Sequence, residues 1–191
     1  MGCFSLSFRK ALILFFLFTS LGYAKTIEGV NFPDERECVQ DKVPLQGVAL
    51  RKATIFGIKV YAFAYYSKNP IKNPESTAFN ERPICMEVVY LRDFSDKDVN
   101  RAWDYQFKES SQFPYDELKK DIENVKLFFG EINGERKESF ILTKDKTIFL
   151  ENSKQVGEIE GINFQKNFLS IWFGKNPPTK EFQKELLQPI K

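Results

Sequence analysis

The apolar and polar positions of residues 43–67, VPLQGVALRKATIFGIKVYAFAYYS, alternate as they do in two paired β-strands. In the first strand both faces carry apolar residues, so we expect burial on both sides. From residue 55 onward the two faces differ. One face carries Phe56, Ile58, Val60, Ala62, Ala64 and Tyr66, and the other carries Ile55, Gly57, Lys59, Tyr61, Phe63 and Tyr65. We predict that the first face is core and that the second combines aromatic rings with hydroxyl groups.

Further strand and helix patterns follow this hairpin. Strand patterns recur at residues 84–91, 139–143, 147–151 and 155–160. Ser95 predicts the start of a first helix, because Asp98 occupies the capping-box position. Apolar stripes predict a second helix from near Pro114 to Gly130, and two more helices follow the last strand, the final one capped by Thr179. This order predicts an α+β fold with a mainly antiparallel sheet and helices on one face.

Residues 1–24 have the pattern of a secretory signal peptide. Arg9 and Lys10 form a positive n-region, residues 11–18 form an apolar h-region, and a small-x-small cleavage site ends at Ala24. The alternative, a transmembrane anchor, needs about 20 apolar residues, and this run is shorter. We therefore predict cleavage before Lys25, secretion into the periplasm, and one mature domain over residues 25–191 without an integral membrane segment.

Charge and composition exclude several function classes. The leader carries two of the 28 basic residues and none of the 26 acidic residues, so the mature chain is formally neutral. This balance predicts no nucleic-acid partner and no overall electrostatic attraction to an anionic membrane. The chain has no histidine, no P-loop and no GxGxxG, which excludes a Ser-His-Asp triad and a His-ligated zinc site. We expect neither a metal nor a cofactor.

Cys38 and Cys85 are the two cysteines of the mature chain. An even pair in an oxidising compartment is compatible with a disulfide. Two buried free thiols are the alternative, and the sequence leaves both open.

Arg51 is the main candidate functional residue. Its guanidinium cannot lose its proton, so apolar surroundings require a negative partner. That partner is an internal carboxylate, water at an exposed strand end, or a ligand carboxylate or enolate bound bidentately. In the last case Tyr61 or Tyr65 would add a hydroxyl donor.

The chain resembles the chalcone isomerase-like family in four segments. Residues 47–67 resemble its paired strands, in which a glycine-rich strand with an arginine precedes an aromatic strand. Residues 28–35, EGVNFPDE, resemble its opening, residues 90–95, YLRDFS, its strand-to-helix junction, and residues 167–187, NFLSIWFGKNPPTKEFQKELL, its last two helices. The resemblance covers nearly all of the chain after residue 25. It implies an open β-sandwich, in agreement with the α+β pattern.

The resemblance also implies roles for individual residues. In the enzyme branch, an arginine polarises a chalcone, and a threonine with a tyrosine-asparagine pair organises water for ring closure. Arg51 matches the arginine, but Tyr61 stands at the threonine position. Tyr115 could match the tyrosine, whereas Ile122 stands at the asparagine position.

In the non-catalytic branch, an arginine and a tyrosine hold a fatty-acid carboxylate, and Arg51 with Tyr61 resembles that pattern more closely. We therefore expect a secreted protein that binds a fatty acid or a similar amphipathic carboxylate. An intramolecular lyase on an unknown substrate and a scaffold protein with a vestigial cavity are the alternatives.

Overall fold

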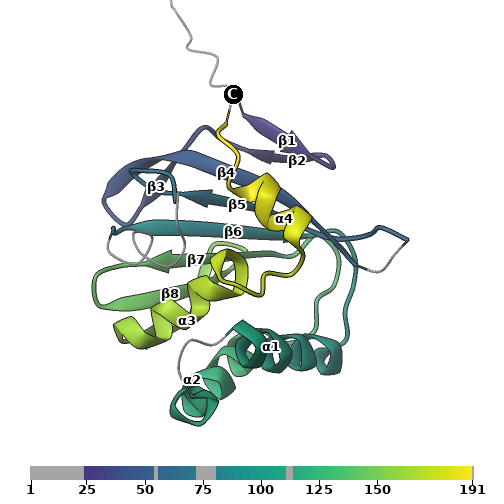
Figure 1. Ribbon diagram of the computed structural model, residues 1–191, viewed down its shortest axis with the longest axis vertical. Helices are drawn as coiled ribbons and strands as arrows, with labels where there is room; N and C mark the ends of the chain where they lie inside the picture. Colours follow the sequence, from purple (N-terminus) through teal and green to yellow (C-terminus); the bar gives the residue numbers. More distant parts are fainter. Residues whose placement is uncertain (1–23, 54–55, 72–80, 111–113, 191) are drawn as a thin grey trace, which may run out of the picture.

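A seven-stranded antiparallel sheet forms the centre of the protein (Figure 1). The computed structural model describes residues 24–53, 56–71, 81–110 and 114–190, so the predicted leader lies outside the described residues except for Ala24. The strands follow one another in the order β3 (Glu35–Cys38), β4 (Asp41–Ala53), β5 (Ile58–Tyr66), β6 (Ile84–Tyr90), β7 (Lys137–Leu142), β8 (Lys146–Glu151) and β9 (Lys154–Glu160). All neighbours pair antiparallel, which confirms the predicted type of sheet.

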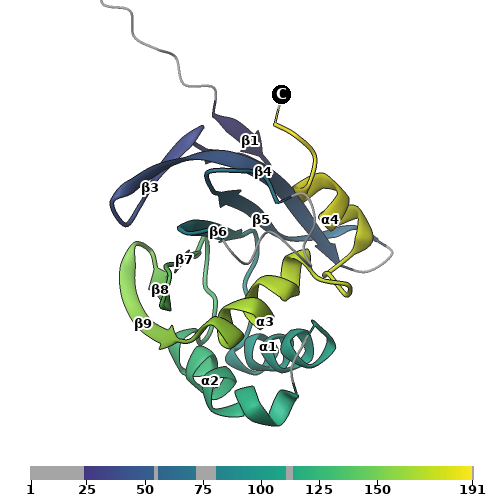
Figure 2. The same cartoon turned by 60° about the vertical axis from the view of Figure 1, so that its left-hand side comes forward.

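Four helices pack on one face of this sheet (Figure 2). They are α1 (Asp96–Ser110), α2 (Tyr115–Phe128), α3 (Ile162–Phe173) and α4 (Lys180–Leu186). The predicted caps form: the Asp98 amide donates to the Ser95 hydroxyl at 3.3 Å, and the Phe182 amide donates to the Thr179 hydroxyl at 3.1 Å. In the described part of the chain, no helix is both long enough and apolar enough to span a membrane. The predicted α+β fold is therefore confirmed.

The helix-covered face of the sheet holds the larger of two hydrophobic cores. Phe63 and Tyr65 of β5 are buried there together with Trp103 of α1 and Phe168 of α3. The alternate β5 residues Ala62, Ala64 and Tyr66 belong to a smaller core on the opposite face. These three residues are core as predicted, but the prediction is wrong for Phe56 and Ile58 of the same face, which are exposed near the turn of the hairpin. The face predicted as mixed holds the larger core. Its rings reach far enough to fill the space beneath the helices, which alanine cannot do.

A two-stranded hairpin, β1 (Lys25–Ile27) and β2 (Val30–Phe32), packs beside the smaller core. Cys38 and Cys85 lie in this core and are joined by a disulfide, with their Cα atoms 6.1 Å apart. Formation of the bond in the cell stays a prediction, because it depends on an oxidising compartment.

Helix α4 can pack closely against the β4–β5 hairpin because residue 47 is a glycine. A Cβ atom added to Gly47 of β4 would stand only 2.0 Å from the carbonyl oxygen of Leu186. This close approach brings Phe182 of α4 into edge contact with the rings of Tyr61 and Phe63. The C-terminal helix thus supports the strand that carries Tyr61.

Candidate ligand-binding site

A cavity of about 240 Å³ lies between the sheet and two of the helices. Its wall comes from strands β4 to β7 on one side and from α1 and α3 on the other, and it is mostly apolar. The polar side chains of this wall are Arg51, Tyr61, Tyr90, Asp98, Gln106 and Glu138. A mostly apolar cavity with a few polar groups is the usual form of a small-molecule site.

The register of the β4–β5 hairpin brings Arg51 and Tyr61 together. The two residues are direct partners across the strands, and both line the cavity. Arg51 is half-buried, and its Nη1 donates to the carbonyl of Lys52. No carboxylate of the described residues forms an ion pair with Arg51. The remaining guanidinium donors are therefore available to an anion in the cavity.

The Tyr61 hydroxyl can donate a hydrogen bond to a ligand in the cavity. It accepts a hydrogen bond of 3.2 Å from the indole Nε1 of Trp172. Burial raises the pKa of Tyr61 to about 12, although Trp172 and the positive charge of Arg51 oppose this shift. The group therefore stays protonated at neutral pH, and no group in the described residues accepts its proton. A ligand oxygen beside Arg51 would meet a second donor here.

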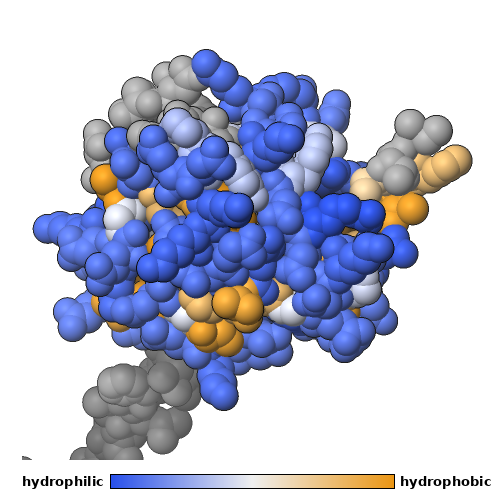
Figure 3. Space-filling model, turned by 90° about the horizontal axis from the view of Figure 1, so that it is seen from below, coloured by the Kyte–Doolittle hydropathy of each residue, from blue (hydrophilic) through white to orange (hydrophobic). Residues whose placement is uncertain are grey.

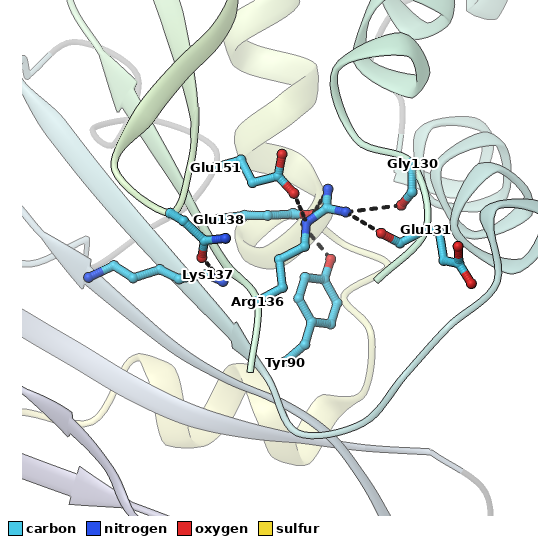
Figure 4. Close-up of polar contacts among 8 residues, drawn as sticks. Tyr90, Gly130, Glu131, Arg136, Lys137, Glu138 and Glu151 are labelled. Carbon is cyan, nitrogen blue, oxygen red and sulfur yellow. Dashed lines mark hydrogen bonds and ion pairs between the residues drawn. The ribbon is translucent and has the colours of Figure 1, made fainter. Parts of the chain in front are cut away.

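A second arginine forms a closed polar cluster beside the cavity (Figure 4). The Nη1 of Arg136 donates to the carbonyls of Gly130 and Glu131, at 3.2 and 2.7 Å. Its Nη2 donates to Glu138 at 3.1 Å, and its Nε lies 2.9 Å from a carboxylate oxygen of Glu151. The side chain of Arg136 is 5% exposed. Internal partners thus surround this guanidinium.

Glu138 connects this cluster to the cavity. It is fully buried, lines the cavity and accepts a hydrogen bond of 3.2 Å from the Tyr90 hydroxyl. Burial raises the pKa of its carboxyl to about 7, and Arg136 and Tyr90 oppose this shift only in part. The cavity therefore has an open cation at Arg51 and a weakly acidic carboxyl at Glu138.

Comparison with known proteins identifies the family. The sequence profile described as chalcone isomerase-like matches residues 24–188. The chain belongs to the chalcone isomerase-like family. A comparison with curated proteins gave no match.

A solved structure of similar fold is that of the fatty-acid binding protein AtFAP1 of Arabidopsis thaliana. The two structures superpose with a TM-score of 0.61 and 18% sequence identity, over 86% of this chain and 96% of that chain. At this identity the likeness supports a chalcone isomerase-like fold and no more. Residue roles must therefore come from the cavity itself.

The other positions that the enzyme branch of the family would use lie elsewhere. The Tyr115 hydroxyl donates to Asp104 at 3.3 Å on the outer side of α1 and α2. Ile122 is fully buried in the core. Neither residue lines the cavity. Of the positions compared with that branch, Arg51 and Tyr61 alone meet at the cavity.

Tyr65, the third predicted site residue, shares a face with Tyr61 but lies two residues further along β5. Its hydroxyl accepts a hydrogen bond of 3.3 Å from the Ile71 amide, and its ring packs edge-on against Phe173 at 5.1 Å. It is not part of the cavity wall. A role for Tyr65 in binding stays a prediction that this placement does not support.

Sequence reasoning missed Glu138, Arg136 and Tyr90. The signal was present: Arg136 and Glu138 alternate with Phe140 on the same face of one strand pattern. Starting that strand at Ser139 left the two charged positions outside it, whereas β7 begins at Lys137. An alternating pattern that continues into charged residues can therefore belong to the same strand as its apolar part.

Proposed function

We propose that this protein binds a fatty acid or a similar amphipathic carboxylate in the cavity, without transforming it. The observation that supports this function is Arg51, which lines an apolar cavity beside the Tyr61 hydroxyl and has no carboxylate partner among the described residues. The ligand carboxylate accepts from both side chains, and the acyl chain lies along the apolar wall. AtFAP1, with a similar fold, is named as a fatty-acid binding protein.

The size of the cavity restricts the ligand. A volume of about 240 Å³ lies below the roughly 300–1,000 Å³ of cavities for drug-sized ligands. Each buried methylene adds at most about 0.8 kcal/mol. We therefore expect affinity to rise with chain length among short and medium acids and to level off once the cavity is full.

The intramolecular lyase is less well supported, because Tyr115 and Ile122 lie away from the cavity. A ring closure would need a water network of the kind those positions supply in the enzyme branch. The scaffold alternative predicts protein that purifies without any bound lipid. Native mass spectrometry of the freshly purified protein distinguishes it from a binder.

We also propose that the chain is exported to the periplasm, cleaved before Lys25 and oxidised at Cys38 and Cys85. The leader pattern and the position of the two sulfur atoms support this route. The intact mass of exported protein should correspond to residues 25–191 less two hydrogen atoms. A mass that includes residues 1–24, or that rises by two thiol-blocking groups without reduction, would contradict the respective part of the proposal.

Calorimetry on delipidated protein tests the binding function. Arg51→Met keeps the bulk of the side chain and removes its charge, so binding of a medium-chain fatty acid should weaken by about 1.5–3 kcal/mol. The matching fatty alcohol should bind as before. Tyr61→Phe, which removes an uncharged donor to the same carboxylate, should weaken binding of the acid by less than Arg51→Met does.

Lys52→Met is the matched control. Lys52 follows Arg51 on the same strand, carries the same charge and is exposed, and it does not line the cavity. It should leave the affinity for the acid unchanged. Equal affinity of the unaltered protein for acid and alcohol would remove the carboxylate hypothesis.

A further inference from the structure

The tip of the β4–β5 hairpin exposes apolar side chains. Phe56 is 84% exposed and Ile58 is 38% exposed. Gly57 between them has a φ of 66°, a conformation that favours glycine. In Figure 3 this tip forms an apolar projection at the right edge of a largely hydrophilic surface.

Basic side chains follow the apolar tip on both strands. Lys52 and Lys59 are direct partners across the hairpin, and both are exposed. The Nζ of Lys59 lies 2.5 Å from a carboxylate oxygen of Glu28 and forms an ion pair with it. Lys52 has no ion pair among the described residues. Residues 51–61 contain no acidic residue. The mature chain is formally neutral, but it has a local positive charge next to this apolar tip.

We propose that this tip docks on an anionic lipid bilayer, with Phe56 and Ile58 inserted between the lipids and Lys52 beside the headgroups. Insertion of a few apolar side chains supported by nearby cations is sufficient for reversible binding to a membrane surface. A stable protein partner needs a total buried area of roughly 1,200 Å² or more. Phe56 and Ile58 alone supply too little area for such a protein interface.

The β4–β5 hairpin also forms part of the cavity wall, so docking and ligand binding would take place at the same end of the protein. Ala53 and Val60 stand at the base of the tip and line the cavity together with Arg51 and Tyr61. Docking through Phe56 would therefore place this end of the cavity near the lipid headgroups. A fatty acid in the bilayer presents its carboxylate at that level. This link to ligand binding rests on the proposed binding function, but the docking itself does not.

Co-sedimentation with vesicles tests the docking in the absence of fatty acid. The mature chain should bind vesicles of phosphatidylcholine and phosphatidylglycerol. Phe56→Ser should lower the partition coefficient about tenfold or more, since it removes a large inserted side chain. Lys52→Gln should lower it about fivefold on these vesicles, and should have no effect on pure phosphatidylcholine.

Leu127→Ser is the matched control. Leu127 is 82% exposed on α2, away from the hairpin, so its replacement should leave vesicle binding unchanged. Tyr61→Phe should also bind vesicles normally, which separates a failure of docking from a failure of fatty-acid binding. In Phe56→Trp, brominated lipid should quench the new indole.

Three results would overturn the proposal. The first is an unaltered protein that does not sediment with the mixed vesicles. The second is an equal loss of binding in Phe56→Ser and Leu127→Ser. The third is a dimer in lipid-free solution that Phe56→Ser dissociates, because the tip would then bind a second copy of the chain.

Discussion

Arg51 and Arg136 both lie at or beside the cavity, but their guanidinium groups differ in burial and in partners. Arg136 is 5% exposed and contacts two carboxylates and two backbone carbonyls. Arg51 lines the cavity, and its one hydrogen bond in the described structure goes to the Lys52 carbonyl. A buried cation that contacts internal carboxylates and carbonyls serves the fold. A cation at a cavity without a carboxylate partner is available for a ligand.

The difference has a physical cause in the position of each residue. Arg136 lies just before β7 and contacts the residues that follow α2, and it is almost fully buried, so the chain must supply its counter-charges. Arg51 is half-buried near the turn of the β4–β5 hairpin, where water can solvate it when the cavity holds no anion. We therefore expect the fold to depend little on the partner of Arg51 and more on the contacts of Arg136 with Glu138 and Glu151.

Arg136→Met is the strongest test of this comparison. It leaves two carboxylates without their cation and two carbonyls without a donor, so the free energy of unfolding should fall by about 3–5 kcal/mol at pH 7. Arg51→Met should change it by less than about 1 kcal/mol, because a half-exposed arginine without a carboxylate partner contributes little. Urea denaturation of both variants gives the answer. Equal losses would mean that Arg51 is also structural.

The sequence predicted the architecture well for identifiable reasons. The hairpin of residues 43–67 shows a period of two over most of its length, and it forms β4 and β5. The cap at Ser95 and the stop at Gly130 bound α1 and α2 closely. Local hydrogen bonds determine such features, so a local pattern is sufficient to find them.

The site was predicted only in part. Arg51 and Tyr61 were found because they lie on one hairpin, where register can be inferred from the chain. Glu138 reaches the cavity only because β7 pairs with β6 and brings it beside Tyr90, which is 48 positions earlier in the sequence. Its alternation with Arg136 and Phe140 places Glu138 on one face of a strand, but no local pattern predicts its contact with Tyr90. Tyr65 illustrates the converse: it shares a face with Tyr61, but its ring packs against Phe173 of α3 and it does not line the cavity.

Glu138 gives the closed cluster a dependence on pH that the open arginine lacks. Burial raises the pKa of its carboxyl from 4.5 to about 7, against the opposing effects of Arg136 and Tyr90 and with a further increase from Glu151. Between these two values the folded protein keeps a proton that the unfolded chain has lost. Raising the pH through this window therefore destabilises the fold, by roughly 3 kcal/mol in total. Below about pH 4.5 both states hold the proton, and the effect ends.

The comparison of pH profiles isolates this contribution from the other carboxylates. Urea denaturation between pH 4.5 and pH 8 should show that Glu138→Gln, which cannot ionise, lacks the loss seen in the unaltered protein. Arg51→Met should retain the loss in full, because Arg51 is not a partner of Glu138. Parallel profiles for the unaltered protein and Glu138→Gln would show that Arg136 holds Glu138 ionised throughout. The cluster would then be a permanent ion pair, and its contrast with Arg51 would concern burial alone.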